Sequence, residues 1–289
     1  MTLARRRIAL EFQLAEGELE DGSSTVTLEG HKAEVIIAHA GIPMSHMDLR
    51  VYGVNLDFIK RFSTYKLLPL QIKNDLVTVM AGDDVNGMKQ VFQGTLLSAV
   101  PNFSGQPDVS FDIISRTGMY YQVAPAAPNS YEGSTDVAEI IASLAKQMGF
   151  VFRNNGVTGK LADQYLSGTL MDQLNTVVEA SNIVCSIDNG VISIWPNNGG
   201  IDDNDVVLIS PKTGLVGYPT FIRQGIVAQV EFTPDMKRGT RVELQSSVPN
   251  ASGEWRVQSM RHELSTVDPQ GKWFTTLQLT PEGFYVNTF

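Results

Sequence analysis

The chain has few of the residues that most often build reactive sites. Its 289 residues include a single cysteine, Cys185. One thiol cannot form an internal disulfide and cannot supply a cysteine metal site. Cys185 lies in the apolar stretch IVCSI, where a free cysteine usually behaves as a small buried hydrophobic residue. We therefore expect Cys185 to belong to a core and not to act as a nucleophile.

Motifs for metal binding and catalysis are missing as well. The histidines form no H-E-x-x-H or similar ligand pair; they are His31, His39, His46 and His262. The chain has no G-x-S-x-G turn, no Walker loop and no G-x-G-x-x-G after a strand. The stretch Gly214–Pro219 has glycines but no lysine, so a rigid turn is a better interpretation than a phosphate loop. We expect no catalytic residue, no bound metal and no cofactor.

Basic charge is scarce, with 22 basic against 31 acidic residues and a net charge of −9. A protein that grips nucleic acid needs a basic surface, so specific nucleic-acid binding is not expected. An acidic wall does not hold phosphate, which suits DNA that only passes by. The basic cluster Arg5-Arg6-Arg7 fits a solvated strand start or a subunit contact better than a phosphate site.

Long hydrophobic runs are absent too. No run reaches the ~18 apolar residues that a membrane span needs. At the start of the chain, Glu11 and Gln13 interrupt the apolar stretch after the arginines, which favours a first strand over a signal peptide. We expect the protein to stay in the cytoplasm until it assembles or is released.

Aromatic side chains are scattered and do not alternate with lysine or arginine as in a nucleic-acid platform. Their strand-like surroundings favour core or interface positions. The residues in question are Tyr120, Tyr121, Trp195, Trp255 and Trp273.

Three pairs of neighbouring carboxylates leave alternatives open: Asp83-Asp84, Asp202-Asp203 and Glu20-Asp21. A glycosidase needs two carboxylates that face one cleft. All three pairs lie in turn-like segments, where carboxylates usually face water. A peptidoglycan-degrading hydrolase, or a carbohydrate-binding adhesin built from β domains, therefore remains an alternative to a structural protein.

Alternating apolar and polar residues predict strands through the first 125 residues. One segment with a single apolar face, residues 55–65, favours a short helix. The pattern is typical of a mostly antiparallel β barrel or sandwich. The expected strands cover residues 6–15, 25–29, 33–38, 48–54, 75–81, 89–100 and 108–116.

The middle of the chain changes in composition. Residues 124–133 are rich in proline, alanine and glycine and are interpreted as a linker. Ser134-Thr135-Asp136 can cap a helix that has one apolar face and ends near Met148, with Gly149 as its stop.

A second helix and a hairpin follow. Thr169 is the expected N-cap, and Asp172 in the first turn favours the helix dipole. The Asn189-Gly190 pair between two apolar alternating runs is a strong signal for a hairpin. With a short strand at residues 150–153, this part predicts a small α+β unit of helix, strand, helix and hairpin.

The last part returns to strand patterns after a second linker at residues 197–204. The expected strands cover residues 206–210, 226–233, 240–246, 253–263 and 272–280. We predict a mainly β chain with an α+β insert. Its domains are a first barrel-like β domain at residues 1–125, the insert at residues 126–197 and a second barrel-like β domain at residues 198–289.

The C-terminal third resembles the hub proteins of contractile phage tails, a group related to the late control protein D family. In that group a strand ending in serine precedes a Thr-Gly-hydrophobic-x-Gly-x-Pro turn, and Phe-x-Pro and Gly-aromatic elements follow. The corresponding positions here are Ser210, Thr213, Gly214, Gly217, Pro219, Gly225, Phe232, Pro234, Gly239, Ser246, Gly253 and Trp255. Stretches of the insert (YLSGTLMDQLNTVVEAS) and of the first domain (DLRVYGV, VFQGTLLSAVPNFSGQPDVSF) are similar to the same family.

The resemblance implies a homotrimer in which the tandem β domains form a pseudo-hexameric ring. Such a ring adapts the sixfold tail tube to the threefold central spike, surrounds the DNA channel and serves tail assembly and genome ejection. Implied partners are the central spike, tail tube or tail-tip proteins and baseplate wedge proteins, with the tape-measure protein a further candidate. The implied location is the tail baseplate of the virion, after assembly in the host cytoplasm. Since the chain stops at Phe289, no fused lysozyme or peptidase domain is expected, and the protein is not expected to be an enzyme.

Overall fold

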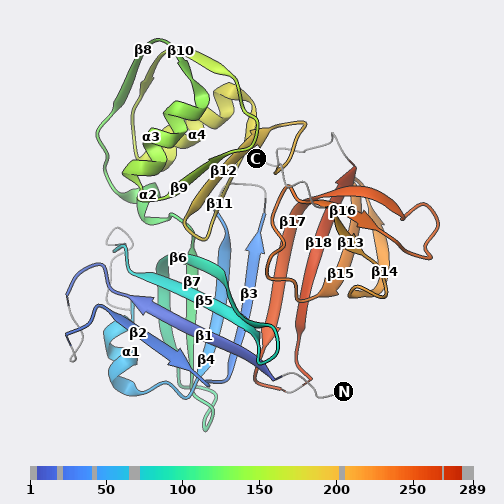
Figure 1. Cartoon of the computed structure of the whole chain (residues 1–289). Helices are drawn as coiled ribbons and strands as arrows, with labels where there is room; N and C mark the ends of the chain where they lie inside the picture. The colour runs from blue at the N-terminus through green and yellow to red at the C-terminus, as the bar shows by residue number, and fades with distance from the viewer. Residues whose placement is uncertain are drawn as a thin grey trace. The chain divides into compact units, whose positions relative to one another are not determined.

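The computed structural model describes residues 5–17, 22–40, 44–64, 72–201, 206–268 and 270–281 (Figure 1). Strands dominate it, as the sequence predicts. The chain forms two compact units, each of which is described by itself. Unit 1 takes Met1–Ala38, Ser45–Tyr120 and His262–Trp273, and unit 2 takes His39–Met44, Tyr121–Arg261 and Phe274–Phe289. The predicted division into three domains stays a prediction.

Unit 1 is built on antiparallel strands in the order β3-β4-β7-β6-β5-β1-β2. The last residues of β17 (Gly253–Ser265) also belong to this unit, and Thr266 N, just after the strand, donates to Ala33 O at 2.8 Å. The strands are β1 (Arg6–Gln13), β2 (Thr25–Glu29), β3 (Ala33–His39), β4 (His46–Tyr52), β5 (Leu76–Asp83), β6 (Gly87–Asn102) and β7 (Ser110–Arg116).

One face of this sheet carries the core of unit 1. Alternate residues of β1, β3 and β4 are buried, as a period of two requires. Helix α1 (Leu56–Phe62) begins at Asn55, whose side chain accepts from Phe58 N at 2.8 Å. The Phe58 ring meets Phe12 edge-on at 5.0 Å between centroids and Phe111 at 5.9 Å. The helix predicted within residues 55–65 is therefore confirmed over Leu56–Phe62, and its aromatic face joins the core.

Unit 2 begins with the α+β insert, which the structure extends beyond the predicted elements. Its helices are α2 (Tyr120–Val123), α3 (Val137–Gln147) and α4 (Leu170–Ser181). Its strands are β8 (Asn129–Asp136), β9 (Val151–Asn154), β10 (Lys160–Leu166), β11 (Ile183–Asp188) and β12 (Val191–Pro196). Strands β8 and β10 pair with each other, and β12 pairs antiparallel with β11 and parallel with β9.

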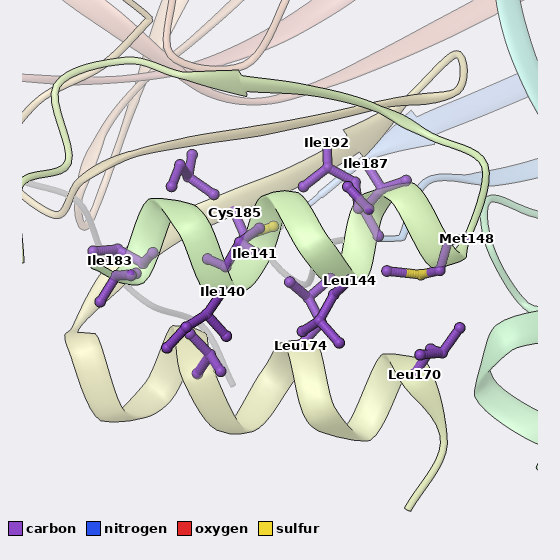
Figure 2. Packing of buried hydrophobic residues seen from close by; sticks show 14 of the residues in the cluster. Ile140, Ile141, Leu144, Met148, Leu170, Leu174, Ile183, Cys185, Ile187 and Ile192 are labelled. Atoms are coloured by element: carbon purple, nitrogen blue, oxygen red, sulfur yellow. The ribbon is translucent and has the colours of Figure 1, made fainter. Parts of the chain in front are cut away.

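The core of the insert lies around α3 (Figure 2). Ile140 and Leu144 project from α3 toward Leu174 of α4, and residues of β11 and β12 cover another side of the same helix. Ile140, Ile141, Leu144 and Leu174 are fully buried. The single apolar face read from the sequence is confirmed, and the second layer comes from the hairpin.

Turn and cap signals in the insert have mixed outcomes. Asn189 and Gly190 both adopt positive φ, as a tight primed hairpin turn requires, and Gly149 ends the α3 segment with φ +72°. The predicted cap of α3 is wrong in its chemistry, because Asp136 is the N-cap but its side chain makes no capping hydrogen bond. The predicted linker at residues 124–133 is also wrong in part. Residues 129–133 belong to β8, where pairing with β10 outweighs a composition that favours a loop.

The C-terminal β part has a core of its own in unit 2, with Ile226, Val242, Val257 and Leu277 fully buried. Its strands are β13 (Val207–Ile209), β14 (Leu215–Ile222), β15 (Gly225–Glu231), β16 (Arg241–Leu244), β17 (Gly253–Ser265) and β18 (Trp273–Pro281). The order β14-β15-β18-β17 continues to β16, which pairs with β17, and to β13, which pairs parallel with β16. The rigid turn predicted at Gly214–Pro219 is wrong, because most of it belongs to β14 with a register shift between Val216 and Thr220.

Candidate assembly surfaces

Cys185 lies in β11 and is buried in the insert core, as predicted. Burial raises the pKa of its thiol to about 12, against the opposing effect of the nearby Arg238 charge. Because the thiolate is the nucleophile, a thiol with this pKa is unreactive at neutral pH. The interpretation of Cys185 as a core residue is confirmed.

His39 and Asp188 form a pair that the sequence analysis missed. His39 Nδ1 lies 2.8 Å from Asp188 Oδ1, and the imidazole is 3% exposed. Ser186 Oγ donates to the other oxygen of the same carboxylate. In a serine hydrolase the histidine stands between the hydroxyl and the carboxylate. Here the carboxylate stands between its two donors, so the group ties His39 to the β11–β12 hairpin and has no triad geometry.

The other histidines do not gather at one place. His31 Nδ1 lies 3.0 Å from Tyr52 O, His46 Nε2 lies 3.1 Å from Asp48 Oδ2, and His262 is buried in β17. Within the described ranges, no three His, Cys, Asp or Glu side chains are close enough to hold a metal ion. The expectation of no metal site stays a prediction.

The acidic pair Asp83-Asp84 lies at the β5–β6 turn, where backbone amides hold both carboxylates. Asp83 Oδ1 accepts from Val85 N at 2.8 Å and from Asn86 N at 2.6 Å, and Asp84 Oδ1 accepts from Arg5 N at 2.7 Å. The hydrogen bond from the Asn86 backbone is the largest cause that lowers the pKa of Asp83. A glycosidase general acid needs a raised pKa, so this geometry does not favour catalysis. The pairs Asp202-Asp203 and Glu20-Asp21 lie outside the described residues.

Four of the five aromatic residues that the sequence singled out lie in a core or pack against one. Trp195 and Trp273 are buried, Trp255 packs against the C-terminal core, and the Tyr121 ring meets Phe150 edge-on at 5.5 Å. Among the aromatic side chains that the structure describes, Tyr218 is the most exposed, at 76%, and the sequence analysis treated it only as part of a turn.

Strand β14 is the strongest candidate for an assembly surface in unit 2. It is the last strand of its sheet, and within the described residues it pairs only with β15. Tyr218, Phe221 and Ile222 on β14 are 76%, 51% and 38% exposed. No charged residue interrupts Leu215–Ile222. An edge strand with exposed apolar side chains and no charge is a ready site for pairing with another chain.

Unit 1 presents a mixed face on the side of its sheet away from the core. Arg50 Nε donates to Asp112 Oδ1 at 2.9 Å across β4 and β7, and Glu34 is the residue opposite Arg50 on β3. Val100 and Ile114 lie half-exposed beside this ion pair, where a hollow of about 360 Å³ opens. Apolar patches framed by charge are common at protein interfaces.

None of the helices within the described residues is long and apolar enough to cross a membrane.

A family model described as baseplate hub gp41 matches residues 58–277, which is more than half of the chain. The chain belongs to this family. The predicted identification as a baseplate hub protein is thereby confirmed, and the hub is a component of a tail baseplate. No curated protein sequence matches the hub.

Two of the similar solved structures are tail proteins. The hub resembles a tail protein from Neisseria meningitidis MC58, with a TM-score of 0.63 and 13% identity over 97% of this chain and 98% of that chain. It resembles a 43 kDa tail protein of prophage MuSo2 from Shewanella oneidensis, with a TM-score of 0.61 and 11% identity over 95% and 97% of the two chains.

A third similar structure comes from a secretion system. It is an Escherichia coli component of the type VI secretion system, described as similar to the T4 phage tail proteins gp27 and gp5. It matches with a TM-score of 0.56 and 10% identity over 88% of the hub and 76% of that chain. At such low identity these likenesses show the fold, which is mainly β as predicted.

Proposed function

We propose that the hub is a structural, non-enzymatic subunit that assembles as a homotrimer around the path of the DNA. In this proposal its first β domain (residues 1–125) and second β domain (residues 198–289) alternate in a pseudo-hexameric ring, and the insert (residues 126–197) lies outside. The ring adapts the sixfold tail tube to the threefold central spike.

The observation that carries this proposal is the end-to-end likeness to a tail protein of the same length. The N. meningitidis structure covers 97% of the hub and is itself covered at 98%, so both β parts and the insert are shared. The family match from residue 58 to residue 277 also runs through all three predicted domains. A chain with two β parts supplies two β domains per copy, so three copies supply the six domains of a ring. Such a ring can join a sixfold partner to a threefold one.

Two surfaces support the idea of a ring. The uncharged edge of β14 exposes Tyr218 and Phe221. An open edge of this kind tends to pair with another chain, which a neighbouring copy in a ring would supply. The outer face of unit 1 combines the Arg50–Asp112 pair with the half-exposed Val100 and Ile114. Together they offer one apolar and one mixed contact surface per protomer.

The chemistry of the described side chains supports a structural role as well. The buried Cys185 thiol has a raised pKa, Asp83 has a lowered pKa, and Asp188 separates Ser186 from His39. None of these arrangements provides a poised nucleophile or general acid. The spike, the tube or tail-tip proteins and the wedge proteins are the proposed neighbours of the ring.

Native mass spectrometry of the purified hub, followed by electron cryomicroscopy of purified tails, tests the proposal. We expect a trimer in solution and a density with threefold symmetry and six β lobes between the tube and the spike. A chain that stays monomeric at all accessible concentrations and is missing from purified tails would contradict it. Clearing of peptidoglycan in a zymogram by the hub alone would contradict the non-enzymatic part.

A further inference from the structure

The β14 edge of unit 2 carries its most exposed side chain at a β-bulge. The register between β14 and β15 shifts between Val216 and Thr220. Within this bulge Gly217 adopts φ +69°, and Pro219 has no N–H that could join a ladder. Tyr218, between them, is 76% exposed. A bulge interrupts regular strand pairing and re-aims a side chain, so at this point the edge presents a single large aromatic anchor.

The rest of the β14 edge is apolar with a basic border. Phe221 and Ile222 follow the bulge and are half-exposed. Two exposed cations, Lys212 and Arg223, lie just before and just after the strand, with no carboxylate between them. On the paired strand β15, the one carboxylate is its last residue, Glu231. The hairpin therefore has two cations for one carboxylate, which favours a partner surface of negative charge.

Unit 1 has a surface of the opposite kind, the hollow of about 360 Å³ on the outer face of β3, β4, β6 and β7. In the register of β6 and β7, Val100 stands opposite Asp112 and Ile114 stands opposite Ser98. Val100 and Ile114 are therefore diagonal neighbours on one face of the sheet. They are 42% and 40% exposed, so the hollow offers apolar surface to a partner.

Carboxylates outnumber cations around this hollow. Glu34, Asp48 and Asp112 line it together with a single cation, Arg50. The Arg50 guanidinium is already engaged, because it donates to both oxygens of Asp112, at 2.9 and 3.3 Å. The side chains of Asp48 and Asp112 stay 52% and 36% exposed. The hollow thus combines apolar surface with a surplus of negative charge, which is the complement of the β14 edge.

We propose that the β14 edge of one copy of the hub docks on the unit 1 hollow of a second copy, with Tyr218 as the anchor. This inference rests on the proposed trimer and assigns one of its contacts. The two surfaces differ, and every chain carries both, so each copy uses each surface once and the contact is head to tail. Such contacts close into a ring when the rotation between copies divides a full turn.

Tyrosine suits this hollow because one end of its side chain is apolar and the other is polar. The ring supplies apolar area to Val100 and Ile114, while the hydroxyl can donate to a half-exposed carboxylate of the hollow. Tyrosine is also among the residues that most often dominate binding energy at protein interfaces. The cations Lys212 and Arg223 add attraction toward the acidic border, which speeds association and fixes its orientation.

A nucleic acid is a poor occupant of the same hollow. Phosphates are held by cations that displace counterions. Here three carboxylates face one arginine, and that arginine is paired with Asp112. A protein surface with apolar side chains inside a charged border fits such a site, and the β14 edge is a surface of this kind.

Crosslinking between two differently tagged copies tests the contact. Cys185 is buried, and burial raises the pKa of its thiol to about 12, so introduced cysteines are the reactive thiols of the folded hub. A Thr220→Cys hub with a large tag is coexpressed with a Ser98→Cys hub with a small tag. Both changes nearly conserve size and leave the anchor intact. A short bismaleimide then joins neighbouring thiols, including pairs too far apart for a direct disulfide.

We expect a linked product that contains one copy of each size on a denaturing gel. Thr27→Cys in place of Ser98→Cys is the matched control, because Thr27 is exposed on β2 of the same unit and does not line the hollow. Adding Tyr218→Ala to the Thr220→Cys copy should lower the yield of the link by about tenfold or more. Linking of the Thr27→Cys control with equal yield would contradict the assignment.

Charge reversal in the full-length hub tests the same contact independently. The edge variant is Lys212→Glu/Arg223→Glu, the hollow variant is Glu34→Lys/Asp48→Lys, and a third variant combines all four changes. Sedimentation velocity at low salt measures association. We expect each double variant to weaken association by about tenfold or more, and the combined variant to recover most of this loss. A combined variant that recovers nothing would show that the two surfaces do not meet.

The outcomes separate this contact from the ring itself. Lys60→Glu/Lys160→Glu is the control for the edge variant, since it makes the same change in charge at exposed sites outside both surfaces, and it should associate like the wild type. A wild-type trimer that gives no link between the Thr220→Cys and Ser98→Cys copies would overturn the contact and leave the ring standing. A strictly monomeric wild type would overturn both.

Discussion

Thr169 and Asp172 close the first turn of α4 by accepting hydrogen bonds from each other's backbone. The Thr169 hydroxyl accepts from Asp172 N, and the Asp172 carboxylate accepts from Thr169 N, each at 3.1 Å. This capping box satisfies N–H groups that have no partner inside a helix. It also fixes where α4 begins, and thereby which of its residues face α3.

Replacement of the cap should destabilise the insert. We expect Thr169→Ala to lower the free energy of unfolding by about 1 kcal/mol, because the exposed N–H of Asp172 loses its acceptor. Thr176→Ala is the matched control, since the Thr176 hydroxyl only donates to Asp172 O within the same helix. Urea unfolding followed by circular dichroism measures both. Equal effects of the two changes would argue against a capping role.

The core around α3 should be sensitive to lost volume. Leu144 is fully buried between α4 and the strands of the insert. Leu144→Ala should lower the free energy of unfolding by about 2–5 kcal/mol, through lost burial and the cavity that remains. Lys146→Ala on the exposed face of the same helix should change it by less than about 0.5 kcal/mol. A small effect at Leu144 would mean that the insert collapses around the gap.

Cys185 should resist thiol reagents in the folded hub. Its pKa is raised to about 12 by burial, so at about pH 8 the thiolate is too scarce to react. We expect no labelling by a chromogenic disulfide reagent until denaturant is added, and full labelling thereafter. Rapid reaction in the native state would contradict the burial of this side chain.

The Arg50–Asp112 pair should make a small contribution that depends on pH. Burial acts to raise the pKa of Asp112, but hydrogen bonds from Arg50 and Ser110 outweigh it, so the pKa lies below the ordinary 3.8. Its stabilisation is therefore complete above about pH 4 and is lost as pH falls through the lower folded-state pKa. Because both side chains are more than a third exposed, Asp112→Asn should cost less than about 1 kcal/mol near neutral pH. The unfolding midpoints of the wild type and of Asp112→Asn should converge as pH is lowered. A difference between them that widens would refute the lowered pKa of Asp112.

The exposed edge of β14 should matter for association and not for folding. Tyr218→Lys/Phe221→Lys places charge on the free edge, which opposes pairing with another chain. We expect the unfolding free energy to change by less than about 1 kcal/mol, since both side chains are exposed, while association weakens. Val85→Lys, at another exposed apolar residue, is the control for added charge. Light scattering measures association, and unchanged association would remove β14 from the contact surfaces.

Much of the local structure could be predicted because its causes are local. The cap of α4 depends on Thr169 and Asp172, three residues apart, and the hairpin turn depends on the adjacent Asn189 and Gly190. The single apolar face of α3 likewise follows from the helical period. Strand alternation predicted most of the β elements in the same way, with ends that differ by a few residues.

Pairing between distant segments could not be predicted. Residues 129–133 have a linker-like composition, yet they form β8 because β10, some thirty residues later, supplies a partner. Pro219 and two glycines suggested a turn, yet the segment is a strand because β15 pairs with it across a register shift. The candidate surfaces share this limit, since the exposure of Tyr218 and Phe221 depends on β14 being the last strand of its sheet.

By itself, the sequence determined that the chain is mainly β with an α+β insert, because alternation, helical faces and turn residues act over a few neighbouring positions. Only the tertiary structure decided that Thr266 bonds to residues near Ala33, 233 positions away, and that His39 binds Asp188, 149 positions away. Contacts of this range depend on which sheet edges and side chains meet after folding. No short window of sequence contains that information.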